Sequence, residues 1–316
     1  MYMYCINYSI RLSQIYFFST GAHNAFAYTL DTSIRVKRFG CLSCCLNSCC
    51  KKLNLNYSLC QRLNLTQQLQ DGVRYLDFTV AFLEDGTEPT TPDENHARIR
   101  VFQGLYGNRL EDEIKVIKDF LNANPKEVII FHLQDFHDQN WTVERKRHAW
   151  DLLFHGFGSK LAPRPDSMDT FTLKHCWEMS YQVVCPTKSW WDVPEEQSKV
   201  LWNEEETIET IWPQTTRLTT LQRHLDREKQ TNLEAFHVSQ GVLTPDCFLI
   251  SCNVCSTLEK TCADPALIAV VGPWLDAMQS SEDRNIIMVD FVEKENFCER
   301  VLRLNTLDEP AQEENK

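Results

Sequence analysis

The stretch IRVFQGLYGNRLEDEIKVIKDFLNANPKEVIIFHL, residues 99–133, reads as strand, helix and strand in succession. Its first four residues form an apolar, β-rich run, and after a glycine-flanked turn the segment 109–123 repeats aliphatic residues at helical spacing. Acidic residues at the start of that segment favour the positive end of a helix dipole. Pro125 then ends the helix, and 128–133, apolar except for His132, resumes as a fully buried strand. The stretch predicts one βαβ unit.

The same alternation continues over the rest of the chain. The other predicted strands are 14–18, 73–80, 181–185, 247–250 and 285–291. The other predicted helices are 66–71, 143–155, 219–230, 265–279 and 296–304. The polar segments 84–97 and 187–216 are predicted loops. Because no glycine-rich phosphate fingerprint is present, the pattern favours an α/β fold with a single (β/α) barrel over two doubly wound halves. We expect the barrel to span 1–307, and 308–316 to be a disordered acidic tail.

Composition narrows the class of protein. The chain has 316 residues, of which 43% are hydrophobic, enough for a substantial core. A formal charge of −12 excludes a broadly basic surface, so we expect no nucleic-acid partner. No run of about 18 apolar residues occurs, and the start of the chain lacks the pattern of a signal peptide, so we expect neither a membrane span nor a leader.

Fourteen cysteines are present, and six of them lie in the segment 41–60. Neither this cluster nor the four cysteines of 247–262 shows paired zinc-ligand spacing, so neither predicts a metal site. Basic residues flank the first cluster, as suits reversible acylation beside a membrane. A loop of unreactive thiols is the simpler explanation of the segment, and we prefer it.

Polar side chains interrupt or follow several predicted strands. They are His23, Asn24, Arg74, Asp77, Gln103, His132 and Asp290. Each has a plain structural explanation, since a histidine after a strand is commonly a satisfied turn residue and Asp77 could pair with Arg74. Together they point to a site, because buried polar groups cost free energy and a barrel carries its working residues at the carboxyl ends of its strands.

Six segments together resemble one known family. They are GAHNAFAYTLD (21–31), NLTQQLQDGVRYLDF (64–78), VFQGLYG (101–107), FLNANPKEVIIF (120–131), FHVSQGVLTP (236–245) and DFVEKENFCERVLRLN (290–305). In this order they resemble the X domain of phosphatidylinositol-specific phospholipase C, most closely the animal proteins that consist of this domain alone. The resemblance implies a distorted TIM-type barrel that cleaves phosphodiesters of inositol lipids.

The resemblance also implies roles for individual residues. His23 stands at the position of the general base that accepts the proton of the inositol 2-hydroxyl, and Asp290 at that of the aspartate that orients it. Asn24, Arg74, Asp77 and His132 would contact the substrate. We expect no cofactor; if calcium took part, Asn24 and Asp77 would be its ligands.

Two positions depart from the family pattern. Gln103 occupies the place of the second histidine, the general acid, and Thr79 that of the arginine that contacts phosphate. A glutamine cannot give up a proton at any relevant pH, and loss of a positioned acid costs about 10²–10⁴-fold in rate. His132 is the one candidate substitute.

Two functions therefore remain open, beside a barrel scaffold with no ligand, which would require the retained His23 and Asp290 to be accidental. One is a phosphoric diester hydrolase in lipid metabolism with a degenerate site and weak activity. The other is an inactive pseudoenzyme that binds inositol phosphate or lipid as a regulatory module. For either we expect a cytoplasmic monomer that contacts the membrane surface transiently and whose partner is an inositol phospholipid or inositol phosphate.

Overall fold

A computed structural model describes residues 19–34, 51–84, 86–87, 89–137, 141–278 and 284–305. The predicted strand 14–18, the cysteines within 41–50 and the predicted tail lie outside these residues. Among the helices of the described segments, none is both long and apolar enough to cross a membrane.

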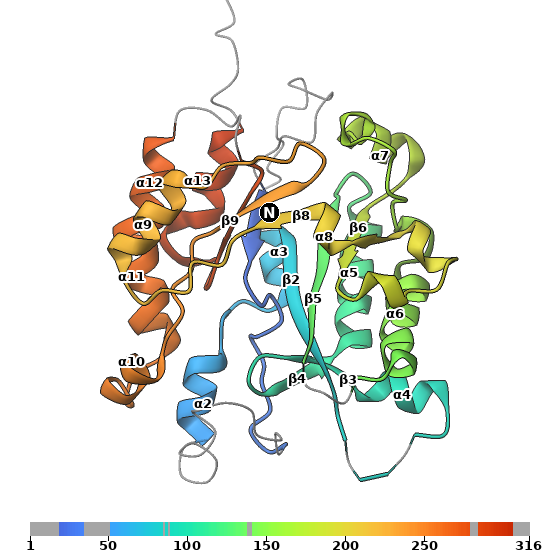
Figure 1. Ribbon diagram of the computed structural model, residues 1–316, viewed down its shortest axis with the longest axis horizontal. Coiled ribbons are helices and arrows are strands. Elements are labelled where there is room, and N and C mark those ends of the chain that lie inside the picture. The colour runs from blue at the N-terminus through green and yellow to red at the C-terminus, as the bar shows by residue number, and fades with distance from the viewer. Residues whose placement is uncertain are drawn as a thin grey trace, which may run out of the picture.

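A curled sheet of eight parallel strands forms the centre of the molecule, with helices on both sides of it (Figure 1). Its strands follow one another in space in the order β7-β6-β5-β2-β1-β10-β9-β8. Their bounds are β1 (Ser19–Ala22), β2 (Val73–Phe82), β5 (Ile129–His137), β6 (Val183–Thr187), β7 (Leu201–Asn203), β8 (Ile208–Thr210), β9 (Phe236–Gln240) and β10 (Ile286–Val289). The edge strands β7 and β8 are consecutive in the chain and are joined by the short helix α8 (Glu204–Thr207). The predicted α/β fold with one distorted barrel is confirmed.

Helices surround this sheet: α4–α7 lie on the right in Figure 1 and α9–α13 on the left, and α2 lies next to α10. Their bounds are α2 (Lys51–Ser58), α3 (Leu65–Gln70), α4 (Pro92–Arg98), α5 (Leu110–Ala123), α6 (Val143–Phe157), α7 (Leu173–Met179), α9 (Leu218–Arg227), α10 (Cys247–Cys252), α11 (Asp264–Ala266), α12 (Gly272–Ala277) and α13 (Phe297–Leu304). Local sequence sets several of their starts. The Thr142 side chain caps α6 by accepting the N–H of Arg145, and Asn64 and Gln67 form a reciprocal capping box on α3.

Two apolar layers follow from the alternation of side chains along the strands. Leu76, Phe131 and Ile287 point to the layer between sheet and helices. Their strand neighbours Tyr75 and Ile130 belong to a second cluster, made mainly of strand residues, that fills the interior of the barrel. Apolar side chains therefore pack on both faces of the sheet.

The predicted βαβ unit of 99–133 is wrong in its topology, although both strands and the helix exist. β3 (Ile99–Phe102) runs antiparallel to β2 and forms a hairpin with β4 (Tyr106–Arg109). Gly104 has φ +66° in the turn of this hairpin, where the N–H of Gln103 donates to the carbonyl of Leu105. The parallel partners of β5 are β2 and β6 instead.

Three further predictions of secondary structure are wrong. Residues 247–250, predicted as a strand, lie in helix α10, because Asp246 caps the N–H of Leu249 and an apolar run of four does not distinguish strand from helix. The predicted loop 187–216 contains β7, α8 and β8, and the predicted loop 84–97 contains most of α4. Strand β9 was not predicted at all.

Candidate functional site

Polar residues form one tier of the barrel interior. The interior cluster contains four strand residues: Tyr75, Ile130, Val238 and Met288. The residue two positions after each of them in the chain is polar. These polar residues are Asp77, His132, Gln240 and Asp290. Since strand side chains alternate with a period of two, each points to the same face as the apolar residue before it. All four are buried, so the tier lies inside the barrel near the carboxyl ends of its strands.

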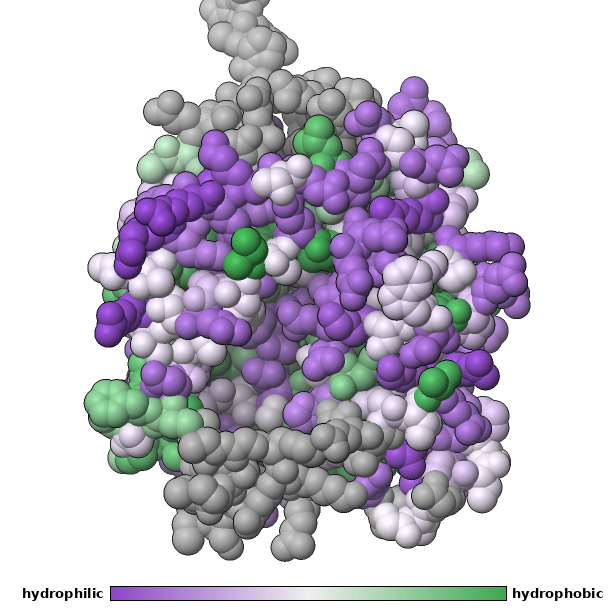
Figure 2. Space-filling model, in the orientation of Figure 1, coloured by the Kyte–Doolittle hydropathy of each residue, from purple (hydrophilic) through white to green (hydrophobic). Residues whose placement is uncertain are grey.

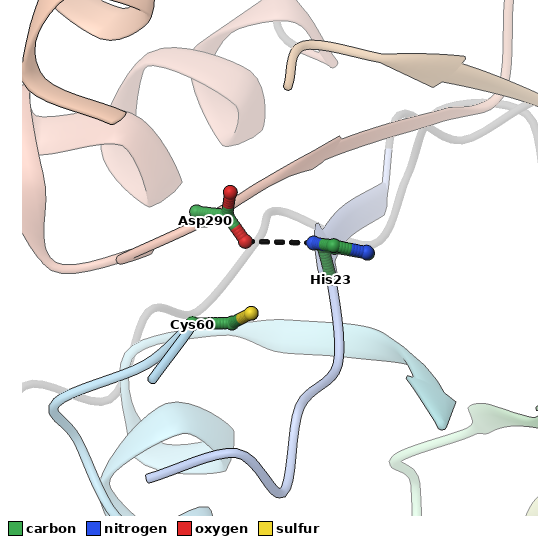
Figure 3. Close-up of side chains that lie close together, drawn as sticks. All are labelled: His23, Cys60 and Asp290. Atoms are coloured by element: carbon green, nitrogen blue, oxygen red, sulfur yellow. Dashed lines mark hydrogen bonds and ion pairs between the residues drawn. The ribbon is translucent and has the colours of Figure 1, made fainter. Parts of the chain in front are cut away.

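His23 follows β1 and pairs with Asp290, which follows β10 (Figure 3). The imidazole Nδ1 lies 2.7 Å from Oδ1 of Asp290, and both side chains are buried. β1 and β10 pair directly, and Gly21 lets them approach closely, because a Cβ there would lie 2.9 Å from Cβ of Met288. The juxtaposition therefore follows from strand pairing, between residues 267 positions apart in the chain.

Asn24 and Gln61 make hydrogen bonds to this pair and to the backbone next to it. The amide nitrogen of Asn24 lies 2.8 Å from Nε2 of His23, a contact that fits a proton on Nδ1 and a free lone pair on Nε2. Gln61 donates to the carbonyls of His23 (2.9 Å) and Val289 (3.3 Å) and accepts the N–H of Val292. One buried amide thus ties together the two backbone segments that carry the pair.

A cavity of about 330 Å³ lies next to the pair. Its lining consists of His23, Asn24, Tyr57, Cys60, Thr79, Gln103, Gln134, Trp212, Leu243, Thr244, Pro245, Leu258 and Asp290. The volume falls within the usual range for small-molecule sites. The structure thus brings His23, Asn24, Thr79, Gln103 and Asp290 to one cavity, and no lysine or arginine stands among these lining residues.

Three other residues predicted for the site do not line this cavity. Asp77 is fully buried, and its Oδ1 accepts the backbone N–H of Asn24. His132 is buried with Nδ1 2.7 Å from the hydroxyl of Tyr75, and it does not line the cavity. Arg74 lies at the start of β2, at the opposite end of the strand, with its Nε 2.7 Å from Oε2 of Glu127. Arg74 therefore lies away from this cavity, and its alternative pairing with Asp77 is wrong.

Four residues at or next to the cavity are not predicted from the sequence: Tyr57, Cys60, Gln61 and Trp212. Cys60 looked like one thiol of a crowded cluster, and Trp212 lay in a predicted loop, yet its ring centroid is 5.1 Å from that of His23. Tyr57, on α2, lines the cavity and donates from its hydroxyl to the carbonyl of Asn253. No period or spacing marks these residues, because loops and short helices bring them to the cavity.

The lining does not fit calcium well. Calcium takes six to eight oxygen ligands, commonly with several carboxylates. Among the described lining residues Asp290 is the one carboxylate, and His23 already hydrogen-bonds to it. Asp77, expected as a ligand if calcium took part, does not line the cavity.

The pKa of His23 responds to this arrangement. Burial lowers it, but the charge of Asp290 and the hydrogen bond to that carboxylate more than compensate, so the pKa lies above the ordinary 6.5. Because the pKa of His23 is higher in the folded than in the unfolded chain, protonated His23 stabilises the fold. This stabilisation is fully present at pH values below the pKa of the unfolded chain, and it is lost as pH rises through the pKa of the folded chain.

Asp290→Asn is expected to lower the pKa of His23, because it removes the charge that opposes the effect of burial. NMR titration of the imidazole measures this shift. The loss in unfolding free energy caused by the substitution should also be larger at about pH 6 than at about pH 9. Asp226→Asn, at an exposed helix position, is the control and should change neither quantity. An unchanged His23 pKa in Asp290→Asn would contradict the pairing.

Comparison with known proteins agrees with the predicted resemblance. No protein-family model matches the chain. PI-PLC X domain-containing protein 2 of Mus musculus is 29% identical over 299 residues, which cover 91% of this chain and 82% of that protein. PI-PLC X domain-containing protein 3 of Homo sapiens is 26% identical and covers 90% and 86%. The predicted resemblance to the X-domain-only proteins is confirmed.

Solved structures share the fold. Phosphatidylinositol-specific phospholipase C from Listeria monocytogenes superimposes with a TM-score of 0.56 at 15% identity, covering 92% of this chain and 93% of that one. A Staphylococcus aureus phosphatidylinositol-specific phospholipase C, solved in work on its membrane binding, gives a TM-score of 0.56 at 13% identity and covers 92% of each chain. At this level of sequence identity the structural likeness shows a shared fold and nothing more.

Proposed function

We propose that the chain is a phosphoric diester hydrolase of the phosphatidylinositol-specific phospholipase C type, with weak turnover of inositol phospholipids. The observation that carries the proposal is the buried His23–Asp290 pair beside a cavity of about 330 Å³. Such a cavity is wide enough for one phosphate and one sugar ring. The similarity to PI-PLC X domain-containing proteins over about nine-tenths of the chain supports the substrate class.

His23 is the general base in the proposed reaction. The inositol 2-hydroxyl oxygen attacks phosphorus, its proton passes to Nε2 of His23, and the bond from phosphorus to the diacylglycerol oxygen breaks. Asp290 accepts the hydrogen bond from Nδ1, so it holds the ring in the required tautomer and stabilises the imidazolium that forms. The raised pKa of His23 implies that turnover increases as pH rises through that pKa, since the base must start unprotonated.

The second half of the reaction lacks its expected groups. The diacylglycerol oxygen needs a proton as it leaves, and Gln103, which lines the cavity, cannot supply one. Thr79 contributes a hydroxyl where a cation would neutralise charge on the phosphate. Water must therefore protonate the leaving oxygen, which is why we propose weak turnover.

Gln103 and Thr79 also favour the second candidate, a module that binds the head group without turnover. Both side chains can hydrogen-bond phosphate or hydroxyl oxygens while promoting no proton transfer. The two candidates share the ligand and differ only in whether phosphodiester cleavage is measurable.

Transient contact with a membrane surface is part of the proposal, because the substrate is a lipid. Apolar side chains are exposed close to the cavity: Phe248 on α10 is 77% exposed and Val254 54%. Figure 2 shows the apolar surface over α10 at the lower left. Asn253, next to Val254, accepts a hydrogen bond from the cavity residue Tyr57, so this surface adjoins the cavity.

The test measures hydrolysis of phosphatidylinositol vesicles and of soluble inositol cyclic phosphate, with calcium and with chelator. Slow turnover is expected, and His23→Ala should abolish it, whereas His155→Ala, which changes an exposed histidine on α6, should not. Head-group binding without turnover, lost in His23→Ala, would establish the second candidate. Neither turnover nor binding would overturn both.

A further inference from the structure

Cys60 lies against the His23–Asp290 pair, and the proposed reaction gives it no role. One ligand atom each from His23, Cys60 and Asp290 lie within 4.8 Å of one another, and all three residues are buried. In Figure 3 the Cys60 side chain lies below the pair, and its sulfur lies on the side that faces the imidazole and the carboxylate. The N–H of Phe291 donates to the carbonyl of Cys60 at 2.8 Å, which holds the cysteine beside Asp290.

The surroundings of this group favour a cation. Asp77 is fully buried nearby, and its Oδ2 has no hydrogen-bond partner among the described residues. Since no lysine or arginine is among the described lining residues, His23 is the one side chain there that can carry positive charge. A bound divalent cation would compensate the carboxylates and stabilise the thiolate.

The donor set identifies the class of cation. Calcium and magnesium prefer oxygen ligands alone, whereas zinc binds thiolate, imidazole and carboxylate at about 2.0–2.3 Å. We propose that Cys60, His23 and Asp290 bind a zinc ion, with the fourth tetrahedral position open to the cavity. Tetrahedral ligand atoms around zinc are separated by roughly 3.3–3.8 Å, so the three side chains need only small adjustments.

Binding changes the protonation of two ligands. The Cys60 thiol loses its proton to solvent as sulfur binds the metal. At His23 the metal takes the lone pair of Nδ1, so the proton of the neutral ring moves to Nε2, and the side-chain amide of Asn24 turns over so that its oxygen accepts the hydrogen bond from Nε2. An imidazole with its proton on Nε2 and metal on Nδ1 has no lone pair left to accept a proton. Zinc therefore inhibits turnover, a consequence that rests on the proposed function, whereas the binding site does not.

Cobalt(II), a spectroscopic substitute for zinc, tests the site directly. Within the described segments a second group, His96, His148 and Asp151, could also hold a metal, so every protein in the test carries His148→Ala. We expect one cobalt ion per chain, a thiolate-to-cobalt absorption band in the near ultraviolet, and displacement by zinc. Cys60→Ser should abolish the band. Cys185→Ser, which removes a buried thiol of β6, should keep it.

Asp290→Asn provides a second variant if Cys60→Ser does not fold, and it should weaken cobalt binding about tenfold or more. Absence of the thiolate band in the parent protein, or its persistence in Cys60→Ser, overturns the site whether or not the protein hydrolyses lipid. In the activity assay zinc should inhibit turnover, and the zinc concentration for half inhibition should rise about tenfold or more in Cys60→Ser, relative to that variant's own metal-free rate. Cobalt binding without inhibition would keep the site and contradict the role of His23 as base.

Discussion

Gln103→His is expected to raise turnover of phosphatidylinositol by about 10²–10⁴-fold, the usual contribution of a positioned general acid. Gln103 and His23 line the same cavity, and an imidazole at 103 would offer a proton to the leaving diacylglycerol oxygen. The turn between β3 and β4 holds this position, so the new side chain would start from a defined backbone. Initial rates on phosphatidylinositol vesicles measure the effect.

Gln134→His is the matched control, because Gln134 is the other glutamine among the described lining residues. We expect no comparable gain from it, since a second imidazole helps only at the position of the leaving oxygen. Adding Thr79→Arg to Gln103→His should increase turnover further by supplying a cation to the phosphate. If the double variant turned over lipid no faster than the parent, the assignment of positions 103 and 79 would be wrong.

Phe131→Ala is expected to lower the free energy of unfolding by about 3–5 kcal/mol. Phe131 is fully buried on β5, and its ring centroid lies 4.4 Å from that of Phe78 and 5.1 Å from that of Phe157. Removing the ring leaves a cavity between the sheet and α6 that these neighbours cannot fill. Urea denaturation at neutral pH measures the loss.

Phe248→Ala makes the same chemical change at a position that is 77% exposed, and its effect should stay within about 0.5 kcal/mol. A loss below about 1 kcal/mol for Phe131→Ala would show that the sheet and its helices do not pack as described. If Phe248→Ala instead weakens binding to lipid vesicles while stability is unchanged, the result also supports membrane contact through α10.

Much of the secondary structure was predictable because its signals are local. Strands β2, β5, β6 and β10 are rich in aliphatic and aromatic residues, and α5, α6, α9 and α13 show helical periodicity. Pairing is not local, which is why residues 99–133 gave the right elements and the wrong topology. β3 pairs antiparallel with β2 and turns back at Gly104 to pair with β4, so it is not one of the parallel strands. Periodicity carries no information about which strands are neighbours.

The site divides in the same way. His23, Asn24, Gln103 and Asp290 were predicted because each interrupts or follows an apolar strand, and the cavity lining includes all four. Arg74 fits the same rule but lies at the amino end of its strand, where it pairs with Glu127. Its position within the strand, and not merely its presence there, decides which end of the barrel it reaches.

The amino-acid sequence by itself determined the α/β class and the strands whose ends carry polar residues. Only the tertiary structure decided that β1 pairs with β10, that Gln61 ties their ends together, and that Cys60 lies against His23 and Asp290. The physical reason is range: helix and strand patterns depend on neighbours a few residues apart, whereas these contacts join segments tens to hundreds of residues apart and exist only once the whole sheet has curled.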